Sequence, residues 1–238
     1  GHTAHASEKE ALEETFQMLN VYADFAQNVM SLPVVRGRKT PGERFAGALE
    51  TLTIEACMQD GKALQSGTSH YLGQTFSKAA DVKFVDENGK LDFVYATSWG
   101  VSTRLIGALI MSHSDDTGLI LPPKIAPIHA VIVPIYKNDE EKSKVDVACK
   151  RIFKELKSKG LTVKYDDRDN MKPGAKYFEW EAKGVPVRIE IGPRDVDSGS
   201  VCVVRRFIKN EDQVPEAELR KLKKSFLPEA DLYAKIEN

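Results

Sequence analysis

The sequence predicts an α/β (α+β) chain in two parts, an antiparallel sheet with helices followed by a compact α/β domain with a mixed sheet. Residues 49–58 alternate between apolar and polar side chains, as a half-buried strand does, and the Asp-Gly and Asn-Gly pairs at 60–61 and 88–89 are typical of hairpin turns. Beyond a proline-rich stretch at 121–127, strand-like and helix-like segments alternate, as in an α/β domain. We therefore expect two domains, residues 1–122 and 123–238.

The first part opens with a helix. Ser7 and Glu10 form a capping-box pattern, and apolar residues recur at helical spacing as far as Met30, before Pro33 ends the pattern. A second apolar helical pattern starts at Leu105. The strands expected between the two helices are 49–58, 62–65, 82–86 and 91–98.

The second part has the order β-α-β-α-β-β-α. Gly160 has the place of a C-cap after the first helix, and a proline at position 173 opens the second. The expected elements are a strand at 129–135, a helix at 139–159, a strand at 162–165, a helix at 173–183, strands at 185–191 and 200–207, and a helix at 215–236.

Composition is that of a folded globular chain, with 42% hydrophobic and 29% charged residues. No apolar run approaches the roughly 20 residues that cross a bilayer. Cys57, Cys149 and Cys202 are odd in number and far apart, which argues against a disulfide framework and a CxxC-type zinc site and favours a reducing compartment.

Charge is distributed unevenly along the chain. Residues 1–122 hold 10 Lys/Arg and 15 Asp/Glu, a net charge of −5, whereas the remaining residues hold 24 and 20, a net charge of +4. A basic half suits contacts with RNA phosphates. Two ordinary domains that differ by chance are the alternative explanation.

Two short segments, 65–70 (QSGTSH) and 99–104 (WGVSTR), each combine glycine, small hydroxyls and a strong hydrogen-bonding side chain at a strand end. Arg104 directly precedes an apolar helical pattern, where charge and free backbone N–H groups both favour an anionic ligand. The alternatives are structural: Arg104 pairs with Asp92 or Glu55, Gln65 and Thr68 are strand-end polar groups, and Phe45 is part of the core.

His2 and His5 lie three residues apart, a spacing that a metal pair on a helix could use. No third ligand lies nearby in the sequence, so we expect no metal site and assign both to the shaping of a loop.

Short sequence motifs spread over nearly the whole chain resemble those of the prolyl-tRNA synthetases of the eukaryote-like type. The resemblance rests on segments 1–5 (GHTAH), 37–40 (GRKT), 45–47 (FAG), 53–56 (TIEA), 67–73 (GTSHYLG), 99–104 (WGVSTR), 121–123 (LPP), 166–169 (DDRD), 184–186 (GVP) and 192–195 (GPRD). It implies that the antiparallel sheet is the C-terminal part of a class II catalytic domain and that the second part is an anticodon-binding domain.

The resemblance also implies an ATP and proline site in the first part. Arg104 matches the arginine of motif 3 that acts on ATP, where a planar cation suits polyphosphate. Gln65 and Thr68 match residues that bind the adenosine part of ATP. The residues that match the proline pocket are Phe45, His70, Trp99, Gly100 and Ser102. Mg²⁺ is expected with ATP, held by phosphates and water rather than by a dedicated protein site.

In the second part, the resemblance implies recognition of the two guanines that proline anticodons share. Glu181 matches the family's guanine-binding carboxylate and Arg194 its cation, with Arg188 as a supporting contact to a base or phosphate. Lys209 is the nearest candidate for a further basic contact. The alternative is that Glu181 and Arg194 pair with each other.

The family's motifs 1 and 2 and its proline-recognising Trp-x-Glu have no counterpart in these 238 residues. We therefore expect an internal or C-terminal fragment of a cytoplasmic, homodimeric proline–tRNA ligase, inactive by itself. The competing hypothesis is a non-catalytic RNA-binding relative. The ATP-site residues argue against it, because such a protein has no use for them.

Overall fold

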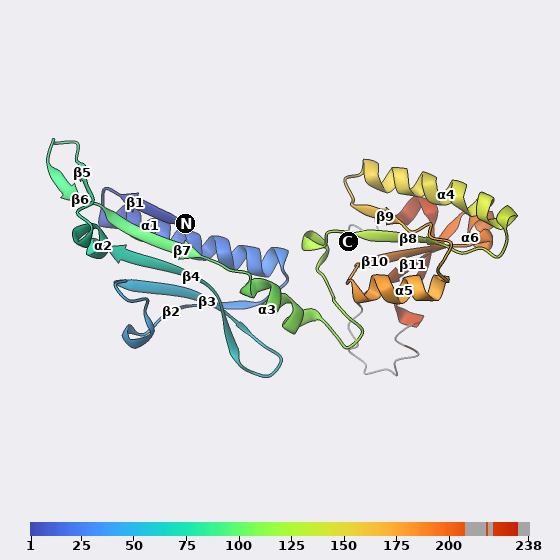
Figure 1. The fold of residues 1–238 in the computed structure, drawn as a ribbon, viewed down its shortest axis with the longest axis horizontal. Helices are drawn as coiled ribbons and strands as arrows, with labels where there is room; N and C mark the ends of the chain where they lie inside the picture. The colour runs from blue at the N-terminus through green and yellow to red at the C-terminus, as the bar shows by residue number, and fades with distance from the viewer. Residues whose placement is uncertain (208–217, 219–220, 233–238) are drawn as a thin grey trace. The chain divides into compact units, whose positions relative to one another are not determined.

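The computed structural model describes residues 1–207, 218 and 221–232, and the chain divides into two compact units, residues 1–112 and 113–238 (Figure 1). Residues 113–122 group with the second unit. Within this segment, the carboxylate of Asp115 accepts two hydrogen bonds from the guanidinium of Arg206, at 3.0 and 2.6 Å. The boundary at residue 122 between a catalytic and an anticodon-binding part stays a prediction.

The first unit is built on a five-stranded antiparallel sheet, as the alternating pattern predicts. Its strand order is β1-β7-β4-β3-β2. These strands are β1 (His2–His5), β2 (Val34–Arg38), β3 (Glu50–Cys57), β4 (Ala63–Gly73) and β7 (Tyr95–Gly100), while β5 (Lys83–Val85) and β6 (Leu91–Phe93) form a separate hairpin.

One face of this sheet is covered by helix α1 (Glu8–Asp24), which runs along the strands in Figure 1. The predicted capping box of Ser7 and Glu10 is present, and the helix continues into the π-helical turn η1 (Phe25–Val29). Leu19 and Tyr22 of α1 pack against Leu52 and Ile54 of β3. The shorter helices are η2 (Pro41–Glu43), α2 (Thr75–Ala79) and α3 (Arg104–His113).

The second unit is a mixed sheet with strand order β12-β11-β10-β8-β9. Strands β8 (Ala130–Pro134), β9 (Val163–Tyr165) and β10 (Val187–Ile191) are parallel, and β11 (Ser200–Arg205) and β12 (Lys224–Pro228) extend the sheet antiparallel. The helices are α4 (Asp139–Ser158), α5 (Pro173–Ala182) and α6 (Pro193–Ser198), with 3₁₀ turns η3 (Pro123–Ile125) and η4 (Glu229–Asp231).

Helices α4 and α5 lie on opposite faces of this sheet (Figure 1). Strand β8 is buried on both faces, so its residues are apolar throughout rather than alternating. Ile132 faces α4 with Val145 and Ile152, whereas Val131 and Val133 face Trp180 of α5. The mixed-sheet α/β architecture that the sequence predicts is confirmed.

Several elements differ from the prediction. The prediction of a helix over 215–236 is wrong at residues 224–228, which form a strand paired with β11. In this strand, Ser225 and Leu227 are the more buried side chains. Residues 2–5 form an edge strand rather than a loop. Strand β2 and helices α2 and α6 were not predicted. In the described part of the chain, no helix has both the length and the hydropathy needed to cross a membrane.

Candidate functional site

The sheet of the first unit has an open face opposite α1, and the register decides which side chains share it. His70 pairs with Thr51 of β3 and with Ser98 of β7, and Thr68 pairs with Thr53 and Gly100. Direct cross-strand partners point to the same side of a sheet. The predicted residues Thr68, His70 and Gly100 therefore lie together on one face.

Trp99 lies on the opposite face. Its indole packs with Leu19 and Tyr22, and its ring centroid is 6.5 Å from that of Tyr22. The ring therefore forms part of the packing beneath α1 rather than lying beside His70. The cause is the period of two in a strand, which turns successive side chains to opposite sides.

Arg104 and Gln65 meet at the end of the open face. Nη1 of Arg104 donates to the backbone carbonyl of Gln65 at 3.2 Å, and the Lys39 ammonium donates to the Gln65 side-chain oxygen. Among the contacts of the described residues, Arg104 pairs with neither Asp92 nor Glu55, the partners of the structural alternative. Two cations thus converge on Gln65, and sequence reasoning missed Lys39 because it lies 26 residues away.

Ser102 has a local structural contact. Its hydroxyl accepts a hydrogen bond from the backbone N–H of Arg104 at 3.3 Å, at the start of α3. An oxygen at this position satisfies one of the free donors of a helix N-terminus. Ser102 therefore helps to define where the helix begins and where Arg104 is placed.

His70 lies in a small polar and aromatic cluster. Its Nδ1 is hydrogen-bonded to the Thr51 hydroxyl at 2.9 Å, and its ring centroid is 5.2 Å from that of Phe45. Burial, and then the charge of Lys39, lower the pKa of His70 below its usual value, so the ring is neutral at neutral pH. Phe45 is 52% exposed, which excludes the simple core-packing alternative for this side chain.

Beside this cluster lies a cavity of about 480 Å³ whose lining is mostly apolar. Phe45 and the ring of Phe76, 6.3 Å away, form part of its wall, together with Ala96 and Ser98. Sequence reasoning missed Phe76, because a phenylalanine in a short helix carries no signal of its own.

His2 and His5 are not a metal pair. They are three residues apart in strand β1, so they point to opposite faces of the sheet, and His5 Nε2 is hydrogen-bonded to the Thr3 hydroxyl at 2.8 Å. The described residues contain no group of three or more His, Cys, Asp or Glu side chains arranged to hold a metal ion. The expected loop-shaping role is wrong, because these residues form an edge strand.

In the second unit, Glu181 and Arg188 are joined directly. Nη1 of Arg188 donates to the Glu181 carboxylate at 2.6 Å, Nε donates to Glu190 at 3.0 Å, and the guanidinium lies 4.1 Å from the ring centroid of Tyr177. The Arg188 side chain is only 8% exposed, whereas that of Glu181 is 33% exposed. Arg188 therefore orients the carboxylate, and Glu181 is the member of the pair that a ligand can reach.

Arg194 lies elsewhere. It is in the first turn of α6, just beyond the carboxyl end of β10, whereas Glu181 is at the end of α5, before β10 begins. Among the ion pairs of the described residues, Glu181 pairs with Arg188 and not with Arg194, so the alternative of a Glu181–Arg194 pair is wrong. Lys209 lies outside the described residues.

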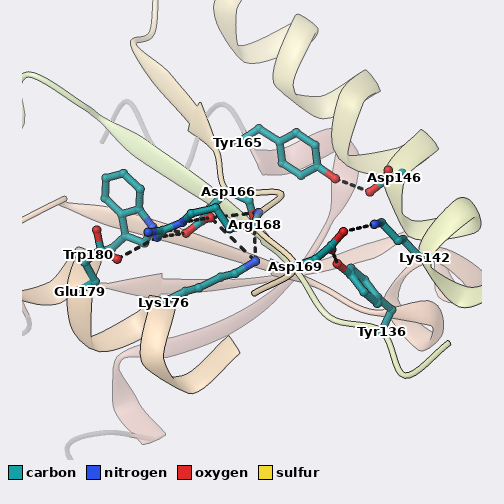
Figure 2. Close-up of polar contacts among 10 residues, drawn as sticks. All are labelled: Tyr136, Lys142, Asp146, Tyr165, Asp166, Arg168, Asp169, Lys176, Glu179 and Trp180. Atoms are coloured by element: carbon teal, nitrogen blue, oxygen red, sulfur yellow. Dashed lines mark hydrogen bonds and ion pairs between the residues drawn. The ribbon is translucent and has the colours of Figure 1, made fainter. Parts of the chain in front are cut away.

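A buried polar network fixes α5, the helix that carries Glu181 (Figure 2). Both oxygens of Asp166 accept hydrogen bonds from Arg168 at 2.7 Å, and Oδ2 also accepts from Nε1 of Trp180 at 2.7 Å. The buried ammonium of Lys176 donates to the Asp166 carbonyl at 2.9 Å. Burial alone would raise the pKa of Asp166, but the bonds from Arg168 and Trp180 and the charge of Lys176 outweigh it and lower the pKa to about 2.

Comparison with protein families matches residues 129–225 to the anticodon binding domain family. The chain is similar to "Proline--tRNA ligase" of Bacteroides fragilis, 59% identical over 214 residues that make up 90% of this chain and 43% of that protein. It is 54% identical to the protein of the same name from Flavobacterium psychrophilum over 237 residues, 99% of this chain and 48% of that one.

Among solved structures, the chain resembles the crystal structure of prolyl-tRNA synthetase from Cryptosporidium parvum complexed with L-proline and AMP. The TM-score is 0.88 at 42% identity, over 99% of this chain and 48% of that one. The chain thus spans about half the length of the curated relatives it matches.

Proposed function

Because this chain belongs to the prolyl-tRNA synthetase family, we propose that it takes part in the ATP-dependent attachment of proline to tRNA. It spans about half the length of the family members it matches. The observation that carries the proposal is the open sheet face of the first unit. On it Thr68 and His70 lie side by side, while Gln65 and Arg104 meet at its end. A second unit that matches an anticodon-binding family follows in the same chain.

In the proposed reaction, the proline carboxylate attacks the α-phosphate of ATP and forms prolyl-adenylate, from which the prolyl group passes to the tRNA. The step needs positioning and neutralisation of charge more than proton transfer. Arg104, which is exposed at the start of α3, would bind phosphate, and Gln65 and Thr68 would bind the adenosine part. Gly100 suits a substrate-facing position, since a Cβ built on it meets nothing within 4 Å. Mg²⁺ would come with ATP, held by phosphates and water.

The proline ring would lie against Phe45, with the neutral His70 as a hydrogen-bonding neighbour. An exposed aromatic face beside an apolar cavity suits a pyrrolidine ring. Ser102 and the Trp99 backbone would contribute from the neighbouring loop and strand. The Trp99 indole, turned toward α1, would support this surface from beneath.

The second unit would read the two guanines of a proline anticodon. The exposed part of the Glu181 carboxylate can accept the N1–H and N2–H donors of one guanine, and Arg194 can donate to a guanine O6 or N7. Arg188, being enclosed, would act by holding Glu181 in place. The proposal extends to the homodimeric assembly and cytoplasmic location implied by the resemblance.

The first experiment is binding of this chain to a proline tRNA at fixed salt, against the same tRNA with both anticodon guanines replaced. We expect replacement to weaken binding markedly, and Glu181→Gln to remove most of the discrimination. Glu179→Gln is the matched control, because Glu179 lies on the same helix but is paired with Arg168 at 2.9 Å and Lys183 at 2.6 Å. Equal binding of both tRNAs would overturn the anticodon-reading role.

The catalytic half of the proposal has its own test. We expect the 238 residues alone to show no proline-dependent pyrophosphate exchange, because they contain no match to motif 2 of the class. Exchange by the purified chain would contradict this expectation. The gene upstream of Gly1 separates the two hypotheses: a reading frame that contains motifs 1 and 2 would support the enzyme fragment, whereas a start codon directly before Gly1 would favour the non-catalytic relative.

A further inference from the structure

Phe226 is an exposed aromatic side chain on the edge strand β12, and it lies on the same sheet face as α5. It pairs with Cys202 of β11, and Cys202 pairs with Glu190 of β10, so the three side chains share one face. Glu190 binds Arg188, which binds Glu181. The face that bears Phe226 is therefore the face that bears the proposed guanine contact.

The register also fixes where Phe226 lies along the strands. The neighbouring row on this face runs through Arg188, Val204 and Lys224, toward the end of the sheet where Glu181 lies. In the other direction β10 ends at Ile191, and Arg194 follows. Along the strand direction, Phe226 thus lies between the two residues assigned to guanine contacts. Two strand spacings place its backbone about 10 Å to the side of β10.

Phe226 contributes little to the core, since 70% of its side chain is exposed. The ammonium of Lys224, two residues before it on β12, bonds Glu190 at 3.2 Å and flanks the ring on this face. An exposed aromatic ring beside a cation is the arrangement on which unpaired RNA bases stack. The occupant is further indicated by the match of residues 129–225 to an anticodon-binding family and by the net charge of +4 on residues 123–238.

We propose that Phe226 is a stacking platform for an unpaired base of the anticodon loop, so that the RNA-binding surface extends from α5 across the sheet to β12. This inference rests on the proposed anticodon-binding function of the second unit. Stacking is tolerant of base identity, because every base has a π face. Phe226 would therefore add affinity, while Glu181 and Arg194 provide the discrimination.

The test compares the affinity of the full chain for proline tRNA in four forms: wild type, Phe226→Leu, Phe226→Tyr and Val147→Ala. Leucine keeps an apolar side chain but removes the π face, so we expect Phe226→Leu to weaken binding about 5- to 150-fold, the cost of losing one stacked base. Phe226→Tyr keeps the ring and should bind as wild type does. Val147, 70% exposed on α4 at the opposite face of the sheet, is the control for the loss of an exposed apolar side chain, and its substitution should leave affinity unchanged.

Salt dependence separates stacking from phosphate contacts. Because Phe226→Leu removes no cation, the slope of log affinity against log salt should equal that of the wild type. As a second readout, 2-aminopurine is placed in turn at each unpaired anticodon-loop position. One position should lose fluorescence on binding to wild type and to Phe226→Tyr but not to Phe226→Leu.

Failure of this inference and failure of the proposed function give different results. If the wild type discriminates the anticodon guanines but Phe226→Leu binds as tightly as the wild type, the stacking role is wrong and the anticodon-binding function stands. If the wild type does not discriminate the guanines, the proposed function fails. A 2-aminopurine signal that is identical in wild type and Phe226→Leu at every position would also overturn the stacking role.

Discussion

Arg188 and Glu181 are joined by a 2.6 Å hydrogen bond in which the guanidinium is enclosed and the carboxylate is partly open to solvent. The enclosure has an evident cause: Tyr177 covers the guanidinium, and Glu190 occupies its other side. A carboxylate fixed in this way presents its free lone pairs in one direction. Preorganisation of this kind reduces the cost of ordering a side chain when a ligand binds.

Arg188→Met should destabilise the second unit by about 3 kcal/mol, because it removes the guanidinium that pairs with the buried Glu190 carboxylate and leaves that carboxylate to Lys224 and the Tyr177 hydroxyl. The measurement is urea unfolding followed by Trp180 fluorescence in a Trp99→Phe background, since Trp99 and Trp180 are the two tryptophans of the chain. The double variant Arg188→Met/Glu190→Leu should recover part of the loss. Simple additivity of the two single changes would contradict the coupling.

Asp166 should make the stability of the second unit depend on acid pH. The pKa of Asp166 is about 2 in the folded chain, below the usual unfolded value of about 3.9. The unfolded state thus binds the proton more readily, so the stabilisation is fully present above the unfolded pKa and is lost as pH falls toward 2. It amounts to about 2–3 kcal/mol.

The matched variant is Asp166→Asn, which keeps the shape of the side chain but cannot lose a proton. Its free energy of unfolding at pH 7 should be lower than that of the wild type, and the difference between the two should shrink as pH falls from about 5 to 2. A difference that is constant over this range would show that the Asp166 charge has no part in the stability of α5.

His70 should titrate below the usual histidine value of about 6.5, because it is partly buried and faces the charge of Lys39. Since the folded state resists protonation, this histidine contributes to stability above the unfolded pKa, and the contribution falls as pH drops below about 6.5. The measurement is the NMR titration of the His70 ring. Lys39→Met should raise its midpoint, whereas Lys39→Arg, which keeps the charge, should not. An unchanged midpoint in Lys39→Met would exclude the role of Lys39.

Local patterns predict most of this fold, and the failures have physical reasons. The capping box of Ser7 and the run of apolar residues in β8 depend on neighbouring residues, so they can be read from the chain. Strand β12 could not be recognised in the same way. Its residues follow a charged, helix-favouring stretch, and its strand conformation depends on pairing with β11, which is a tertiary contact.

The candidate site shows the same division. Gln65, Thr68, His70 and Arg104 could be selected because each lies in a short segment of unusual composition. Lys39, Thr51 and Phe76 come from distant parts of the chain and enter only through the sheet register. The orientation of Trp99 could not be predicted from the sequence either, because a shift of one residue along a strand turns a side chain to the other face of the sheet.

Gly67 in β4 and Gly100 in β7 allow a matched test of why a glycine occupies each of these strand positions. A Cβ on Gly67 would lie 3.0 Å from Val101 Cγ1 and 3.2 Å from Ile54 Cγ1, whereas a Cβ on Gly100 meets nothing within 4 Å. Val101 is exposed and can yield, but Ile54 is enclosed in the packing beneath α1. We therefore expect Gly67→Ala to lower the free energy of unfolding of the first unit by about 1 kcal/mol.

Gly100→Ala should leave the stability within about 0.5 kcal/mol of the wild type, as substitutions that meet no neighbour do. Thermal or urea unfolding followed by Trp99 fluorescence in a Trp180→Phe background measures both variants, since Trp180 belongs to the second unit. The contrast decides between two explanations of Gly100. If Gly100→Ala is as costly as Gly67→Ala, the fold itself requires the glycine. If it costs nothing, packing does not require it, and open space for a substrate becomes the better explanation.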